Sequence, residues 1–480
     1  MESHPSFQCA DPALQKLFSL AQKRCRENLK DFAGRPVLVE GGGYSKIWLE
    51  TQPMGGAMYA LYDPQVAYNN VFLFMEHQRA DGRLPGSIQL ANGHMEAQFN
   101  KLQGFCFPYP AMQVLSLRGN LPSERAALME CLIRFDGYLW RTRNTCHDNI
   151  LESFCVYDTG EDKCVRYGNV PVWWEADTPP EGYDRVPMGS QEIMSWSYAA
   201  RKTIAWILQS GGKAEAAEAW EQKALEVRHA LCSRLWNDDD AMLYDLDARN
   251  QPIRMHTHLP LRCMYFGALP RHVADAFVRR QLLRPDAFWT TLPLPSLSVS
   301  DPAFQNAPEN NWSGQVEGLT LQRAIHALEN YGYESIVTAL GRRLLTALIK
   351  GDYLFPQQFD PLTGAPSRVG MLSHEPIPEG STEPVQDAYG PTLLAALEYI
   401  AHIYGIAYER GEIWFSLGSG LEYAYTVPIG SRQYAIRSDG QHADIAVDHH
   451  VIGRFPCGTR IRTDAEGRIL GKRPLEGPLC

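Results

Sequence analysis

The sequence predicts an all-α protein that ends in a small β-rich extension. Residues 192–236 carry apolar side chains at helical spacing in two runs, separated by Ser210-Gly211-Gly212, which is the pattern of a helical hairpin. Further helical runs, some paired across a short turn, occupy residues 122–140, 274–283, 316–331, 333–348 and 391–404. Past Gly411, short alternating stretches with glycine at the turns predict strands. We therefore expect a helical domain over residues 1–408 and a β-rich extension, packed on it, over residues 409–480.

Composition and charge argue against several classes of protein. The 480-residue chain has a formal net charge of −10 and no run of lysine or arginine, so nucleic acid is not an expected partner. No apolar run approaches the roughly 20 residues of a membrane helix, and residues 1–5 lack the basic and apolar regions of a signal peptide. The eleven cysteines form no Cys-x-x-Cys pair, which indicates reduced thiols. We expect a soluble cytoplasmic protein without a membrane partner, metal ion or cofactor, and the sequence leaves its oligomeric state open, a homo-oligomer included.

An acidic loop at residues 157–167 is the first candidate for chemistry. It places Asp158, Glu161 and Asp162 around Gly160, with Arg166 downstream. A carboxyl group acts as a general acid when burial or a like-charged neighbour raises its pKa, and these three carboxyls could perturb one another in this way. A solvated acidic turn or a helix cap is the alternative. The long connections over residues 166–191 and 284–314 are typical of functional loops.

Six segments occur in an order that resembles the six-hairpin α/α-barrel glycosidases, which include trehalase and the mannosylglycerate and glucosylglycerate hydrolases. They are Tyr44-Ser45-Lys46-Ile47-Trp48-Leu49-Glu50, residues 78–86, Thr159-Gly160-Glu161-Asp162 with Arg166, Asn310-Asn311-Trp312-Ser313-Gly314, residues 354–364 and residues 382–390. The resemblance implies an (α/α)6 barrel with a cleft built from the long loops. It also implies an inverting glycoside hydrolase that acts on a small glycoside or disaccharide, so the expected partner is a small carbohydrate.

The resemblance assigns the general acid to Asp162. The residues expected to bind the sugar are Trp48, Glu50, Arg166, Trp173, Trp174, Trp312, Gln357 and Gln358. Indole faces can stack on the apolar face of a sugar, although ordinary packing explains any one tryptophan as well. Arg166 offers a fixed fork of donors to a substrate, or it braces its loop. Glu317, at the start of a predicted helix, is explained by its favourable position in the helix dipole.

One departure from the family pattern concerns the base that activates water. Where trehalase-like sequences read Glu-x-Tyr-Asp, this chain reads Gln357-Gln358-Phe359-Asp360, and an amide cannot take up a proton at neutral pH. We therefore expect Glu383 to be the base, with Asp387 in reserve. Two other interpretations follow from the missing carboxylate: an inverting phosphorylase or a lyase on the same scaffold, or a carbohydrate-binding relative without catalysis. The sequence does not specify the sugar or its linkage.

Overall fold

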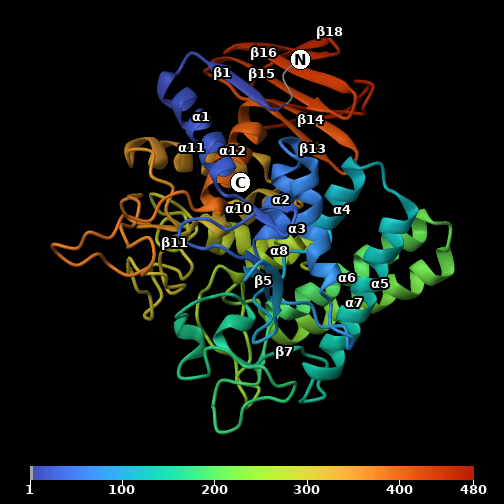
Figure 1. Ribbon diagram of the computed structural model, residues 1–480, viewed down its shortest axis with the longest axis vertical. Helices are drawn as coiled ribbons and strands as arrows, with labels where there is room; N and C mark the ends of the chain where they lie inside the picture. Colours follow the sequence, from blue (N-terminus) through green and yellow to red (C-terminus); the bar gives the residue numbers. More distant parts are fainter. Residues whose placement is uncertain (1–3, 480) are drawn as a thin grey trace.

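The computed structural model describes residues 4–479, and its largest part is a double ring of helices (Figure 1). Twelve α-helices lie within these residues. They are α1 (Pro12–Glu27), α2 (Gln52–Met58), α3 (Pro64–Glu76), α4 (Pro108–Leu117), α5 (Pro122–Thr142), α6 (Gln191–Ser210), α7 (Ala214–Leu235), α8 (Leu259–Tyr265), α9 (Arg271–Phe277), α10 (Gly318–Glu329), α11 (Glu334–Lys350) and α12 (Gly390–Tyr404). The helical hairpin predicted over residues 192–236 is confirmed as α6 and α7.

The even-numbered helices form a closed inner ring. Helix α2 packs on α4, α4 on α6, α6 on α8, α8 on α10, α10 on α12, and α12 on α2 again. The odd-numbered helices lie outside this ring. Helices α3, α5 and α11 pack on both neighbours in the chain, α7 packs on α6, α9 on α8, and α1 on α11 and α12. Burial follows the same division, because every residue of α10 is buried whereas α7 buries a single stripe. The predicted (α/α)6 barrel is therefore confirmed.

The connections are long at one end of the barrel and short at the other. Each inner helix follows a long connection, and these cover residues 28–51, 77–107, 143–190, 236–258, 278–317 and 351–389. The turns that leave the inner helices are short, as at residues 211–213 and 330–333. Small antiparallel ladders tie the long connections together. They pair β2 (Leu29–Phe32) with β3 (Arg35–Leu38), β4 (Ile47–Trp48) with β5 (Ser87–Ala91), β5 with β6 (His94–Gln98), β7 (Glu152–Ser153) with β8 (Met188–Gly189), β9 (Trp236–Asn237) with β10 (Met242–Leu243), and β11 (Val316–Glu317) with β12 (Gln358–Phe359).

Two antiparallel sheets follow the barrel, and Figure 1 shows them at one end of the molecule, away from the long connections around β7 and β11. The first sheet has the order β1-β15-β16-β17-β18 and the second β13-β14-β19-β20. The strands are β1 (Ser6–Cys9), β13 (Ile406–Glu409), β14 (Glu412–Leu417), β15 (Glu422–Ile429), β16 (Arg432–Asp439), β17 (His442–Val447), β18 (His450–Pro456), β19 (Thr459–Thr463) and β20 (Ile469–Pro474). Buried and less buried residues alternate along β15 and β17, as expected for strands with one face in a core.

The all-α class is not confirmed, because twenty strands lie within the described residues and nine of them build these two sheets. Strand β1 joins the C-terminal strands, with Ser6 opposite Thr426 and Cys9 opposite Tyr423. The division of the chain at residue 408 stays a prediction. Within residues 4–479, no helix has the combination of length and apolar character needed to cross a bilayer.

Candidate active site

The acidic loop is held in place by Asp158. Its Oδ1 accepts a hydrogen bond from the Leu102 amide at 3.0 Å, and its Oδ2 accepts one from the Phe154 amide at 2.8 Å. Arg143 Nη1 lies 3.0 Å from the same carboxylate. The next turn passes so close to Glu50 that a Cβ on Gly160, where φ is +72°, would overlap the Glu50 carboxylate. Asp158 and Gly160 thus position the loop between Val156–Asp158 and Val165–Tyr167, both short 3₁₀ helices.

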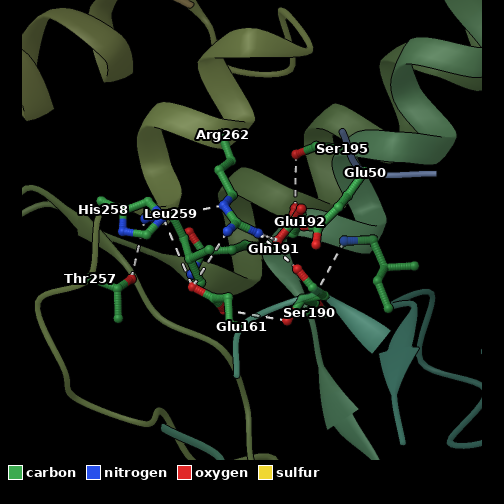
Figure 2. A network of polar contacts seen from close by, with 12 residues as sticks. Glu50, Glu161, Ser190, Gln191, Glu192, Ser195, Thr257, His258, Leu259 and Arg262 are labelled. Carbon is green, nitrogen blue, oxygen red and sulfur yellow. Dashed lines mark hydrogen bonds and ion pairs between the residues drawn. The ribbon is translucent and has the colours of Figure 1, made fainter. Parts of the chain in front are cut away.

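Glu161 belongs to a buried network of carboxylates and arginines (Figure 2). Arg166 forms an ion pair with both Glu161 and Asp245, and the side chains of all three residues are buried. Burial alone would raise the pKa of Glu161, but the charges of Arg166 and Arg262 lower it to about 2. Glu161 is therefore an ionised structural group, unsuited to donate a proton at neutral pH.

Arg262 and Arg323 neutralise two further carboxylates at the ends of the inner helices. Arg262 Nη1 donates to Glu192 Oε2 at 2.8 Å and to the Thr159 carbonyl at 2.9 Å, which links α8 and α6 to the acidic loop. Arg323 Nη2 lies 3.4 Å from Glu50 Oε2, and Gln103 Nε2 donates to Glu50 Oε1 at 3.0 Å. Burial nevertheless raises the pKa of Glu50 to about 7.

His258 is neutral in this network. Burial and the charge of Arg262 lower its pKa to about 3. Its Nδ1 lies 3.0 Å from the Ser296 carbonyl and its Nε2 accepts a hydrogen bond from Arg262 Nε at 3.2 Å. The Nδ1–H tautomer satisfies both contacts, so His258 orients Arg262 and stays uncharged.

Asp162 differs from its neighbours in having no arginine partner. Within the described part of the chain, its carboxylate accepts one hydrogen bond, from Asn310 Nδ2 at 2.6 Å, and its carbonyl accepts one from the Trp312 amide at 3.0 Å. Burial raises the pKa of Asp162 to about 6, although Lys101, Asn310 and Lys163 oppose the change. The side chain is half-buried, so the carboxyl holds its proton in weakly acidic solution and can still be reached.

A chain of contacts connects Asp162 to Gln357. Asn310 Nδ2, which binds Asp162, also lies 3.5 Å from the Tyr44 hydroxyl, and this hydroxyl donates to Gln357 Oε1 at 3.0 Å. The backbone N–H of Gln357 donates a hydrogen bond to Gln386 Oε1 at 3.1 Å. The neighbouring Gln358 donates through Nε2 to the carbonyls of residues 307–309, which lead into Asn310. The structure therefore brings together the predicted acid and both predicted glutamines.

Glu317 is the residue that the sequence analysis did not select. It lies on β11 directly before α10, and its side chain is fully buried, at 0% exposure. Neither carboxylate oxygen has a hydrogen-bond partner within residues 4–479. Burial raises its pKa well above the usual range, and the negative charge of Asp162 adds to this effect. The helix-dipole explanation accounts for its position at a helix start, but not for its burial without donors.

Glu383 and Asp387, the predicted bases, both have donors of their own. Glu383 accepts hydrogen bonds from the amides of Leu372 and Ser373, each at 2.8 Å, in an exposed turn. Asp387 is bonded by Arg24 Nη1 and by the Phe355 amide, also at 2.8 Å. As bases they stay predictions, and their carboxylates stabilise the connection that leads into α12.

The predicted aromatic residues lie in two different settings. Trp48 is half-buried, its indole Nε1 has no partner within the described residues, and Lys101 Nζ lies 4.9 Å from its ring. Trp312 is buried with Arg262 4.8 Å from its ring. Trp173 is 59% exposed, and Trp174 donates its Nε1 to the Thr178 carbonyl in the same outer connection. Trp48 and Trp312 thus lie beside the buried polar groups, and the other two lie outside them.

Comparisons with known proteins concern the family and the fold of the chain. A sequence model described as "Mannosylglycerate hydrolase MGH1-like glycoside hydrolase domain" matches residues 55–376, which is more than half of the chain. No curated protein sequence matches.

Solved structures share the fold. A mannosylglycerate hydrolase from Thermus thermophilus, in complex with glucose, aligns with a TM-score of 0.61 at 16% identity, over 79% of this chain and 99% of the other. Neutral trehalase from Saccharomyces cerevisiae aligns with a TM-score of 0.55 at 12% identity, over 77% and 74% of the two chains. A rhamnosidase from Bacillus sp. GL1 aligns at 0.60 and 11% identity, over 93% of this chain and 42% of the other. The predicted relationship to the six-hairpin glycosidases is confirmed, and the chain belongs to the mannosylglycerate hydrolase MGH1-like family of glycoside hydrolases.

Proposed function

We propose that the protein hydrolyses a small glycoside or disaccharide with inversion of configuration, and that Asp162 is the general acid. The observation that carries this proposal is the isolation of the Asp162 carboxyl among buried groups. Glu161, Glu192 and Glu50 each face a guanidinium, whereas Asp162 is bonded by the neutral amide of Asn310. A carboxyl with a pKa of about 6 gives up its proton readily to a leaving oxygen near neutral pH.

The surroundings of Asp162 support a small carbohydrate as the substrate. The half-buried Trp48 offers an indole N–H without a partner, and Asn310 offers a buried Oδ1 without one, both within the described residues. A sugar could bind to these polar groups through its hydroxyls and to the tryptophan ring through its apolar face. The small glycosides named for the relatives, mannosylglycerate among them, fit a site of this kind.

The test measures product release from disaccharides and glycosyl-glycerates, with and without inorganic phosphate, and follows the anomeric form of the product by NMR. We expect release without phosphate and a first-formed product of inverted configuration. Asp162→Asn keeps the shape of the side chain and removes its proton, so turnover of a substrate with a poor leaving group should fall by at least about 10²-fold. Asp184→Asn, at an exposed position later in the same connection, is the control.

Three results would contradict the proposal. Unchanged turnover in a folded Asp162→Asn variant would remove Asp162 from the mechanism. Release that depends on phosphate and gives a sugar phosphate would assign a phosphorylase instead. Binding of sugars without any release would point to a carbohydrate-binding relative.

A further inference from the structure

We propose that Glu317 is the general base of this enzyme, and that it supplies from β11 the carboxylate that is missing at Gln357 on the adjoining chain segment. The inference rests on the proposed hydrolytic function and names the residue that activates water. It replaces Glu383 and Asp387, whose carboxylates are bonded by amides and by Arg24.

The backbone places Glu317 beside Gln357. Strands β11 and β12 pair antiparallel, with Glu317 directly opposite Gln358, and the Gly318 amide donates to the Gln357 carbonyl at 2.7 Å. Residues opposite one another in such a pair have Cβ atoms about 4.5–5.5 Å apart. Glu317 therefore lies one residue from Gly318, which bonds Gln357, and its own side chain shares a face of the ladder with that of Gln358.

The approach of these two segments is tight and specific. A Cβ on Gly318 would overlap the Thr392 hydroxyl, and Thr392 Oγ1 itself donates to the Pro356 carbonyl at 2.7 Å. Glycine at 318 thus allows α10 to begin against α12 and against the segment that carries Gln357. This packing fixes where the Glu317 side chain leaves the backbone.

The carboxylate of Glu317 is buried but has no donor of its own. Each of the other buried acidic groups near it is bonded: Glu50 by Gln103, Glu161 by Arg166, Glu192 by Arg262 and Glu40 by the Tyr389 hydroxyl. For Glu317, neither oxygen has a partner within residues 4–479. Burying a carboxyl without hydrogen bonds costs free energy. Such a group is retained where a bound molecule supplies the missing hydrogen bonds. A water molecule held for attack on a sugar is such a molecule.

The charges of Glu317 and Asp162 both affect the same neighbouring side chain, Tyr44. The negative charges of both groups raise the pKa of the Tyr44 hydroxyl, whose larger cause is burial. Tyr44 itself bonds Gln357 and lies beside Asn310, the partner of Asp162. Both carboxyls therefore lie within electrostatic reach of the Tyr44 hydroxyl, and an inverting acid and base must likewise lie near one sugar ring.

Charge around Glu317 decides when it can accept a proton. Burial, Asp162, Glu50 and Glu161 favour its neutral form, and Arg262 favours the carboxylate. Together they raise the pKa of the Glu317 carboxyl well above its ordinary range. A water that donates a hydrogen bond to it favours the ionised form, and the reaction runs from the state in which Asp162 holds the proton and Glu317 does not.

The proposed step is balanced in atoms and protons. Water attacks the anomeric carbon as Glu317 takes one of its protons, and Asp162 gives its proton to the leaving oxygen as the glycosidic bond breaks. The products are the free sugar and the free alcohol. Glu317 then returns its proton to solvent and Asp162 regains one.

The experiment compares four proteins on a glycoside that the wild-type protein cleaves: wild type, Glu317→Gln, Gln357→Glu, and the double variant. We expect Glu317→Gln to reduce kcat by at least about 10²-fold. In the double variant the carboxylate returns to residue 357, and we expect at least a tenfold recovery over Glu317→Gln. Glu379→Gln, at an exposed position in the connection before α12, is the control for replacing a glutamate in these connections.

Two further measurements keep a structural effect apart from a catalytic one. Thermal unfolding of each variant shows whether it is folded, and sodium azide added to Glu317→Ala should restore turnover by giving a glycosyl azide. The acidic limb of the kcat/KM profile in the wild-type protein should lie above the ordinary range of a glutamate, and it should move in the double variant.

Each remaining outcome overturns the inference. Unchanged kcat in Glu317→Gln, or a loss that neither azide nor Gln357→Glu restores, excludes Glu317 as the base while leaving the hydrolytic function intact. A loss in Glu383→Gln that azide restores would assign the base to Glu383. No release by the wild-type protein on any glycoside overturns both the inference and the proposed function.

Discussion

Three carboxyl groups lie within five residues of the acidic loop, and each has a different environment. Asp158 accepts hydrogen bonds from two backbone amides and holds the loop. The charges of Arg166 and Arg262 lower the pKa of Glu161 and keep it ionised. Burial raises the pKa of Asp162 to about 6, and its carboxylate accepts a hydrogen bond from the side-chain amide of Asn310. The side-chain chemistry is nearly the same in all three, so their neighbours determine which one can donate a proton.

We expect Asn310→Ala to move the alkaline limb of the pH–rate profile upward. The Asn310 amide donates to Asp162 and thereby lowers the pKa of this carboxyl, so removing the amide raises the pKa. An acid with a higher pKa stays protonated to a higher pH, and activity then persists further into the alkaline range. The measurement is kcat/KM against pH.

Asn311→Ala is the matched control for this shift. Its Nδ2 donates to Gln305 Oε1 at 3.2 Å and not to Asp162, so its alkaline limb should stay where the wild type has it. A downward shift in Asn310→Ala, or an equal shift in both variants, would contradict the role given to Asn310.

The acidic loop could be selected from the sequence, but Glu317 could not. A Gly-x-Asp string followed by arginine is visible in the residues themselves, and so is the replacement of glutamate by Gln357. Glu317 stands at a helix start, where a solvated glutamate is ordinary, and its function depends on burial and on absent donors. Both properties come from the packing of distant segments, which no local pattern contains.

At the scale of elements, Arg166 joins two connections of the barrel. Its guanidinium pairs with Glu161 in its own loop and with Asp245 in the connection after α7. Asp245 Oδ1 in turn accepts a hydrogen bond from the Gln191 amide at 2.9 Å, at the start of α6. The arrangement favours the bracing role of Arg166 that the sequence left open, because both ends of its fork are occupied.

We expect Arg166→Met to destabilise the protein by about 3–5 kcal/mol, since it leaves the buried Asp245 without its counter-ion and Glu161 with only the more distant Arg262. The measurement is the free energy of unfolding by urea. Arg249→Met is the control, because its ion pair with Asp184 is exposed on both sides and such pairs contribute about 1 kcal/mol or less. Unchanged stability together with a large rise in KM would instead support substrate binding by Arg166.

A polar face helped to locate the outer helices from the sequence, although the wholly buried α10 was located as well. Outer helices such as α5 and α7, and the long α6, show apolar residues at helical spacing, and the sequence located them. The inner helices α2 and α8 are short and almost wholly buried, so they lack the alternation that marks a surface helix. Strand β1 pairs with a partner more than 400 residues away, and its four residues carry no signal of that.

At the scale of the whole molecule, a buried network joins the barrel to the second sheet. Arg460 on β19 pairs with Glu329 at the end of α10, and its Nη2 donates to the His402 carbonyl of α12 at 2.9 Å. His402 Nδ1 lies 3.0 Å from Glu329, and its Nε2 lies 3.4 Å from Glu398. Figure 1 shows α12 leading directly into these strands, so the network lies where the two parts meet.

This network predicts a loss of stability in alkaline solution. Burial lowers the pKa of His402, but Glu329 and Glu398 outweigh it and raise the pKa to about 9, whereas an unfolded histidine titrates near 6.5. Because the folded protein holds this proton more tightly, the contribution is complete below about pH 6.5 and is lost as pH rises through about 9. One proton gives a slope of at most about 1.4 kcal/mol per pH unit.

The free energy of unfolding by urea, measured from pH 6 to pH 10, should fall in the wild-type protein and fall less steeply in His402→Gln. His442→Gln, at an exposed position on β17, should keep the wild-type slope, and equal slopes in all three proteins would mean that His402 does not hold its proton in the folded state.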